Sequence, residues 1–336
     1  MESDKTLTIF CLAGLANRIR VLVSGIAAAE VTGRTFRMFW PSTPACSAAF
    51  RELFTNNWPV IDVENPDQLL RFNRSNTRTP LGSIENLITD PQQNIVLGAT
   101  DWIIDCQRHR APAMHARCCK LLGELEPLPE LAEQIAEIQQ SFQPVMIGVH
   151  LRRGDFQRKR PDVAWNTRTA FRAIDRFLKK APEAGILLCS VDGAVNWRTG
   201  DQINNEGVHE AFQKRYGDRV ITTSPGSLDR RTMESAQDAL VDLWLLRSTH
   251  MIVGTTGSSF SYLSAFDRDV EYAWVGGKSP VYSVIHWLVV LTGVHWLVCT
   301  LFRAKYGHDR PFPVAWRRLV RNPKRNMKAK QDGIKG

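Results

Sequence analysis

Residues 145–155 read Val-Met-Ile-Gly-Val-His-Leu-Arg-Arg-Gly-Asp, a short apolar run that ends in a cluster of charged side chains. The apolar part, Val145–Leu151, has the length and composition of a buried strand. A pattern of helical period follows at Thr167–Lys179, and a second buried strand at Ile186–Val191. Two strands joined by a crossover helix cannot form a tight hairpin, so the pattern predicts parallel pairing.

The same alternation continues in both directions along the chain. It predicts further strands at Leu7–Leu12, Thr35–Trp40, Ile95–Gly98, Val220–Thr222, Met251–Gly254 and Glu271–Val275. It predicts helices at Asn17–Val31, Val208–Tyr216 and Met233–Arg247, and a helix face carrying Leu131, Ile135 and Ile138. The predicted fold class is therefore α/β, with two facing Rossmann-like domains built on parallel sheets.

The helical period stops at Gln140–Pro144, where proline blocks its continuation. We therefore expect a first domain at residues 1–142, a second at 143–278 and a carboxy-terminal segment at 279–336. The stretch Trp58–Asn94 is rich in Asn, Pro and Thr and is expected to be irregular surface structure of the first domain.

The composition is that of an ordinary globular protein: 336 residues, 43% hydrophobic and 23% charged. It excludes collagenous, disordered and small disulfide-rich proteins. The seven cysteines show no metal-ligand spacing and lie mostly in apolar runs, which favours buried free thiols in a reducing compartment. The apolar stretch near the amino terminus is too short for a signal-peptide core, so a cytoplasmic protein is expected.

The net charge of +9 is concentrated at the carboxy terminus. Residues Arg303–Gly336 contain 11 Lys and Arg and two acidic residues, which leaves the rest of the chain neutral. A basic tail attracts phosphates of lipid or nucleic acid. An RNA-binding arm has little support, because the body is neutral and the tail has few aromatic residues, so no nucleic-acid partner is expected.

Ser279–Phe302 is a run of 24 residues without Asp, Glu, Lys or Arg, long enough to span a bilayer. A single span would place the basic tail across the membrane from the body, against the positive-inside tendency. One interpretation is an interfacial helix or re-entrant hairpin, with the tail on an anionic membrane surface. The other is a buried helix that packs on the first domain.

Ligands of open parallel sheets bind beyond the carboxyl ends of the strands, so functional side chains are expected in the loops there. The loop after Val145–Leu151 holds His150, Arg152, Arg153 and Asp155. Guanidinium groups match phosphate oxygens with paired hydrogen bonds, so this loop indicates an anion site. The alternative is that Asp155 merely pairs with one of the arginines.

The loop after Met251–Gly254 offers the hydroxyls of Thr255, Ser258 and Ser259 before a helix expected to begin near Tyr262. Hydroxyls and free amide groups at a helix start can hold a phosphate. A serine cap with local turns is the alternative.

Two other places carry polar groups of interest. Gly14 allows a tight turn after the first strand, and Asn17 and Arg18 are expected to point into the cleft between the domains, although Asn17 could simply cap a helix. Asp242 lies in an apolar helix and needs a partner, which could be the N1–H and amino group of a guanine or an arginine such as Arg247.

Together these loops resemble the superfamily of α1,6-fucosyltransferases, α1,2-fucosyltransferases and protein O-fucosyltransferases. The points of resemblance are Gly14 and Asn17, the string His150–Asp155, Asp192, and the block from Asp242 to Ser259. The resemblance covers Leu7 to Phe266. It implies a GT-B fold and inverting transfer of fucose from GDP-fucose, held mainly by the second domain, to a hydroxyl of a glycan or glycoconjugate.

The resemblance also implies roles for individual residues. Arg152 would bind the β-phosphate and, with Arg153 and Asn17, form the catalytic set. The donor would further contact His150, Asp192, Asp242, Thr255, Ser258, Ser259 and Gly14. No metal cofactor is implied, and Asp267-Arg268-Asp269 is expected to be a solvated turn rather than a metal site.

One departure leaves the general base undetermined. The α1,6-fucosyltransferases have a glutamate shortly after the arginine motif, where this chain reads Phe156-Gln157-Arg158-Lys159-Arg160. Asp155 and Asp162 are nearby carboxylates. The missing glutamate favours one alternative, a module that binds a GDP-sugar or glycan without catalysis. A second alternative is a transferase that uses another sugar nucleotide such as GDP-mannose.

Overall fold

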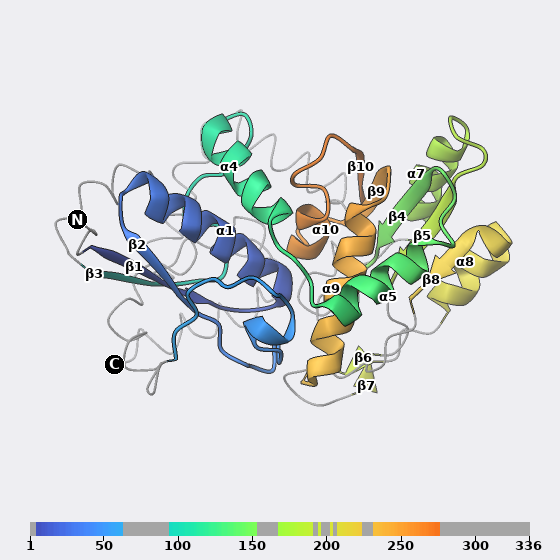
Figure 1. Ribbon diagram of the computed structural model, residues 1–336. Helices are drawn as coiled ribbons and strands as arrows, with labels where there is room; N and C mark the ends of the chain where they lie inside the picture. Colours follow the sequence, from blue (N-terminus) through green and yellow to red (C-terminus); the bar gives the residue numbers. More distant parts are fainter. Residues whose placement is uncertain are drawn as a thin grey trace, which may run out of the picture. The chain divides into compact units, whose positions relative to one another are not determined.

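The computed structural model describes residues 5–62, 94–152, 167–190, 194–195, 202–203, 207–223 and 231–275 (Figure 1). The chain divides into two compact units, Met1–Gly277 and Lys278–Gly336, and every described residue belongs to the first. Several predicted features lie outside the described residues: Arg153, Asp155, Asp162, Asp192, most of Trp58–Asn94, Cys299, and the whole segment 279–336.

The first sheet has three parallel strands in the order β2-β1-β3. They are β1 (Thr6–Cys11), β2 (Thr35–Phe39) and β3 (Asn94–Ala99), with Thr6 opposite both Thr35 and Asn94. Helix α1 (Leu15–Val31) connects β1 to β2 and lies along this sheet in Figure 1. Gly25 permits the close approach, because a Cβ there would lie 3.0 Å from Ile9 Cγ1.

The second sheet has five parallel strands in the order β10-β9-β4-β5-β8. They are β4 (Met146–His150), β5 (Gly185–Cys189), β8 (Val220–Thr222), β9 (Met251–Thr255) and β10 (Glu271–Val275). Between them the chain forms α7 (Thr167–Leu178), α8 (Val208–Tyr216), α9 (Met233–Arg247) and α10 (Ser259–Leu263). The predicted parallel α/β fold is confirmed.

Among the remaining described elements, α5 was predicted and the others were not. Helix α4 (Pro112–Gly123) precedes α5 (Pro129–Gln139), which is the helix expected from Leu131 and Ile135. Two 3₁₀ turns, η1 (Phe50–Glu52) and η3 (Gly217–Arg219), and a short antiparallel pair, β6 (Ala194–Val195) with β7 (Gln202–Ile203), complete the described structure. The predicted boundary at 142/143 falls between α5 and β4, and both sheets belong to one compact unit.

The strands of the second sheet send alternate side chains into two apolar clusters, as the two-residue period of a strand requires. Ile147, Ile186 and Leu188 join one cluster with residues of α7 and α8. Leu187 and Cys189 join the other, which includes α9 and continues to β1 and α1. One apolar cluster therefore extends from the second sheet to the first.

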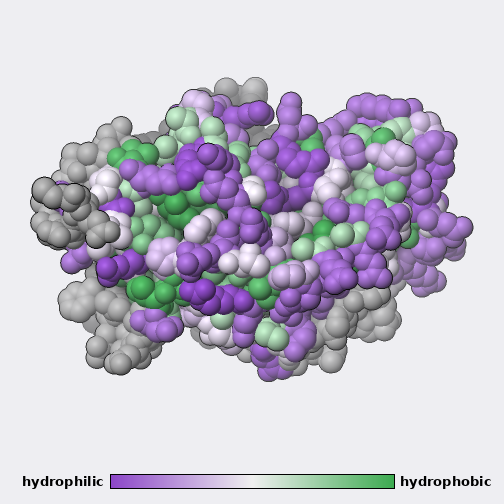
Figure 2. All heavy atoms as spheres, in the orientation of Figure 1, coloured by the Kyte–Doolittle hydropathy of each residue, from purple (hydrophilic) through white to green (hydrophobic). Residues whose placement is uncertain are grey.

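The surface and the cysteines fit a globular body. Hydrophilic side chains cover much of the face seen in Figure 2, with smaller hydrophobic groups between them. The six described cysteines are all free thiols, and five of them are buried, as predicted. Within the described part of the chain, no helix combines the length and the apolar composition needed to cross a bilayer.

Candidate active site

Each sheet has a point at which the order of its strands reverses, where ligands of open α/β sheets bind. In the second sheet this point lies between β4 and β9, and in the first between β1 and β3. The segments of chain that follow these four strands border one cavity of about 950 Å³. That volume lies within the usual range for small-molecule sites.

The cavity is lined from both sheets. Residues after β1 and β3 contribute Asn17, Arg20, Asp101, Trp102, His109 and His115. Residues after β4 and β9, together with β10, contribute Arg152, Ser258, Ser259, Tyr262 and Trp274. Of the predicted site residues, Asn17, Arg152, Ser258 and Ser259 are thus brought together. Gly14, His150, Asp242 and Thr255 are not among the described residues that line the cavity.

Thr255 holds the end of β4 beside the end of β9. Its Oγ1 accepts a hydrogen bond from the backbone N–H of Arg152 at 2.8 Å and donates one to the carbonyl of His150 at 3.1 Å. The residue is 1% exposed. The hydroxyl predicted to bind donor is therefore committed to two backbone groups, and its effect is to fix Arg152 at the cavity.

His150 is oriented by α10. Its Nδ1 lies 2.6 Å from Ser261 Oγ, and its ring lies against Phe260 with centroids 4.7 Å apart. Ser261 Oγ also accepts the backbone N–H of Thr255 at 3.1 Å. Ser261 was not among the predicted site residues, yet it connects the two loops that carry them.

Helix α10 begins at Ser259, three residues before the predicted start near Tyr262, so that prediction was wrong. Gly257 adopts φ +75°, a left-handed conformation that favours glycine, and Ser258 then occupies the helix cap. Ser258 Oγ is buried and has no hydrogen-bond partner among the described residues. A buried hydroxyl without a partner on a cavity wall suits a polar ligand group.

The loop after β1 differs from the prediction in two ways. Gly14 caps α1 with an ordinary φ of −77°, and the left-handed residue of the turn is Ala13, with φ +70°. Arg18 does not face the cavity: it is 0% exposed, and its guanidinium donates to the carbonyls of Ala13 and Pro41 and to Thr43 Oγ1. Arg18 therefore braces the loop from inside.

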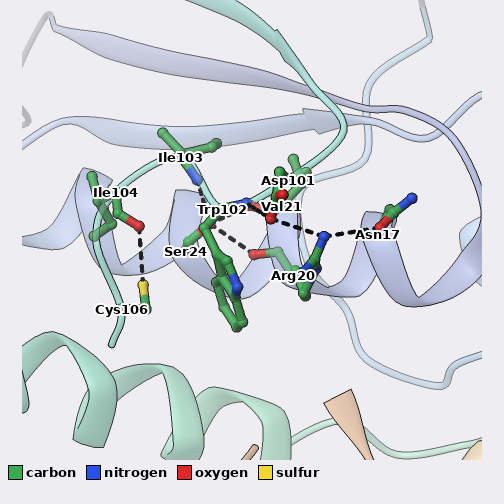
Figure 3. A network of polar contacts seen from close by, with 9 residues as sticks. All are labelled: Asn17, Arg20, Val21, Ser24, Asp101, Trp102, Ile103, Ile104 and Cys106. Carbon is green, nitrogen blue, oxygen red and sulfur yellow. Dashed lines mark hydrogen bonds and ion pairs between the residues drawn. The ribbon is translucent and has the colours of Figure 1, made fainter. Parts of the chain in front are cut away.

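Asn17 is the third residue of α1 rather than its cap, and it belongs to a polar network at the cavity wall (Figure 3). Its Oδ1 accepts from Arg20 Nη2 at 2.9 Å, and the same Nη2 lies 2.8 Å from Asp101 Oδ1. The guanidinium of Arg20 also lies over the ring of Trp102, 5.7 Å from its centroid. Burial lowers the pKa of Arg20, whereas Asp101 acts in the opposite direction.

Arg20, Asp101 and Trp102 were missing from the predicted site. The signal that could have found the last two is their position, because they closely follow the predicted strand Ile95–Gly98. The carboxyl ends of predicted strands are the expected positions of site residues, and the sequence alone assigned no role to this loop.

Asp242 is partly buried on α9, and its Oδ1 accepts from Thr223 Oγ1 at 2.7 Å. Burial raises the pKa of its carboxyl to about 6, and the bond from Thr223 opposes the shift. Arg247, the alternative partner, pairs instead with Asp267 at 2.6 Å. Since the side chains of that pair are each 13% exposed, Asp267 is not part of a solvated turn.

The described residues contain no group of three or more His, Cys, Asp or Glu suited to a metal ion.

Comparison with known proteins places this fold. No protein-family model matches the chain, and no curated protein matches its sequence. The solved structures that it resembles include NodZ alpha-1,6-fucosyltransferase soaked with GDP-fucose, at 15% identity and TM-score 0.51, covering 79% of this chain and 93% of that one.

Two further similar structures have the same TM-score of 0.51. An Arabidopsis thaliana FUT1 variant in complex with GDP is 13% identical, with 82% of this chain and 71% of that one covered. POFUT1 in complex with GDP is 10% identical, with 82% and 100% covered. At these identities the likeness is one of fold, and the predicted GT-B type of fold, expected from the resemblance to fucosyltransferases, is confirmed.

Proposed function

We propose that this protein is an inverting glycosyltransferase that transfers fucose from GDP-fucose to a hydroxyl of a glycan or glycoconjugate. The observation that carries the proposal is the cavity itself, where Arg152 and Ser258 from the second sheet border the same space as Asn17 and Arg20 from the first. Of the structures of similar fold, NodZ was soaked with GDP-fucose, and the FUT1 variant and POFUT1 are complexes with GDP.

The chemistry assigns the diphosphate to the second sheet. As the acceptor oxygen attacks the anomeric carbon, negative charge grows on the departing β-phosphate. A guanidinium at that oxygen stabilises the charge through charge-assisted hydrogen bonds. Arg152 supplies this group in the proposal, with Arg153 beside it in the sequence, and Ser258 and Ser259 supply hydroxyls from the start of α10.

The guanine end of the donor would reach His150 and Asp242, and Asp192, which follows β5 in the sequence, would also bind the donor. A carboxylate can accept hydrogen bonds from both the N1–H and the amino group of guanine. Asn17 would lie near the transferred sugar. The positive charge in this scheme comes from arginine, so we expect transfer to persist in EDTA.

A panel of nucleotides tests the proposal. The purified protein should be stabilised by GDP and GDP-fucose, because a ligand at 100 times its dissociation constant adds about 2.7 kcal/mol to the free energy of unfolding. Incubation with GDP-fucose and a glycan array should then label specific acceptors. Preference for GDP-mannose would indicate a different donor, and binding of GDP-fucose without turnover on any acceptor would indicate a non-catalytic module.

A further inference from the structure

Asp101 is the only carboxylate among the described residues that line the cavity. It follows β3, and its side chain is 52% exposed. Its Oδ1 accepts from Arg20 Nη2 and from the backbone N–H of Trp102, each at 2.8 Å. Oδ2 has no partner within the described part of the chain, so one oxygen is anchored and the other is available to a ligand.

The anchor of Asp101 is rigid. The side chain of Arg20 is 10% exposed, and it is fixed by Asn17 Oδ1 on one side and the ring of Trp102 on the other. The loop itself is fastened to α1, because the N–H of Ile103 donates to Ser24 Oγ at 3.1 Å (Figure 3). A carboxylate held in this way needs little reorganisation when it receives a proton.

We propose that Asp101 is the general base of the transfer, an inference that rests on the proposed function. The acceptor oxygen forms a bond to the anomeric carbon of the donor, and the bond from that carbon to the β-phosphate oxygen breaks. GDP leaves with the electron pair of the broken bond. The proton of the acceptor hydroxyl passes to Oδ2 of Asp101, while Arg20 and Asn17 act as positioning residues.

The other titratable groups of the cavity are less suited to this role. His115 has Nδ1 3.1 Å from the carbonyl of Cys106 and Nε2 3.4 Å from Cys119 Sγ, so both ring nitrogens are engaged. His109 is exposed and lies on the same wall. Among the described residues that line the cavity, Asp101 alone presents a carboxylate oxygen, and its side chain is held by Arg20.

The test uses GDP-fucose with two nucleophiles that differ in one property. Water, like a sugar hydroxyl, must lose a proton when it attacks, whereas azide has none to lose. Asp101→Ala should slow release of GDP in water by about 100-fold, which is the lower range for loss of a general base. Sodium azide should restore GDP release from this variant and yield fucosyl azide, while the dissociation constant of GDP stays unchanged.

Two variants keep the result interpretable. Asp101→Asn retains an oxygen for Arg20 and should show the same loss and the same rescue if Asp101→Ala folds poorly. Asp175→Asn is the control. In the wild-type protein Asp175 of α7 pairs with Arg215 of α8, outside the residues described at the cavity, so this variant should keep the wild-type rate.

Unchanged GDP release in either Asp101 variant would overturn the assignment, and so would a loss that azide does not restore. Failure of the proposed function looks different, because the wild-type protein itself would then not release GDP from GDP-fucose, whether or not it binds GDP. Transfer lost instead in His109→Gln, with Asp101→Asn fully active, would move the role to that histidine.

Discussion

Arg152 occupies a position that the neighbouring strand dictates, since its backbone is held by Thr255 while its side chain lines the cavity. Lysine at this position would keep the charge but lose the planar pair of donors that matches phosphate oxygens. We expect Arg152→Lys to lower turnover of GDP-fucose by 100-fold or more, the effect of removing a donor aimed at developing charge. Thermal melting should change little, and steady-state kinetics with unaltered turnover would contradict the assigned role.

Asp242 makes stability depend on pH. The unfolded chain leaves its carboxyl with the ordinary pKa of 3.8, whereas burial raises the pKa in the folded protein to about 6. Between these values the folded state binds more protons, so the free energy of unfolding falls as pH rises. In Asp242→Asn the amide cannot ionise, and the variant should gain roughly 1–3 kcal/mol relative to wild type between pH 4.5 and 7.5.

Urea denaturation of both proteins at several pH values measures this difference. The Asn variant keeps an oxygen for Thr223, so the comparison isolates ionisation from the loss of a hydrogen bond. A gap between the two proteins that does not change with pH would show that the carboxyl titrates at its ordinary value.

Arg18 and Arg20 have different roles that could not be told apart from the sequence. They lie two positions apart on α1, yet one is buried against Ala13, Pro41 and Thr43 and the other lies at the cavity with Asp101. Except for Ala13, these partners come from segments far along the chain, so local pattern could not separate a bracing arginine from one at the site.

Among the elements, α10 and β9 are packed so closely that one glycine controls their contact. A Cβ on Gly254 would lie 2.6 Å from Ser261 Cβ and would also clash with the hydroxyl of Tyr272. Gly254→Ala should therefore destabilise the protein by about 1–3 kcal/mol, as overpacking does. It should also weaken GDP binding, because α10 carries Ser258 and Ser259 to the cavity.

Gly123 gives the matched control. It ends α4, and a Cβ there would meet nothing within 4 Å, so Gly123→Ala should change stability by no more than about 0.5 kcal/mol. Chemical denaturation of both variants checks the prediction, and equal stabilities would remove the role given to Gly254.

Four elements were predicted to the residue. The observed bounds of α8, β8, α9 and β10 equal the predicted ones. Helix α4 was missed because its described buried face consists of Cys118, Leu121 and Leu122, all in its second half. The start of α10 was missed because a run of small polar residues is typical of a loop as well as of a capped helix.

For the molecule as a whole, the order of strands explains most of the site that the sequence could predict. Chemistry placed after β1, β4 and β9 could be found by searching strand ends, and Asn17, Arg152 and Ser258 do border one cavity. What could not be predicted is how side chains divide between binding and support. Thr255 is the example, since its hydroxyl accepts a hydrogen bond from the N–H of Arg152 and donates one to the carbonyl of His150.

The charge distribution leads to a prediction for the full chain. We propose a cytoplasmic protein held at an anionic membrane surface by residues 279–336, because the net charge of +9 is concentrated in Arg303–Gly336. The full chain should sediment with membranes and be released by a high-salt wash, and a chain that ends at residue 302 should be released more readily. Fractionation that finds both forms soluble would favour the alternative of a helix packed on the body.

The apolar cluster that contains Ile9 and Cys11 of β1 also contains Leu187 and Cys189 of β5, so one face of the second sheet shares its interior with the first sheet. We therefore expect that the described residues do not fold as two independent pieces, one for each sheet. We expect that a nucleotide bound only where β4 meets β9 would slow amide exchange as far away as β3, because local opening of one sheet exposes apolar side chains of the other.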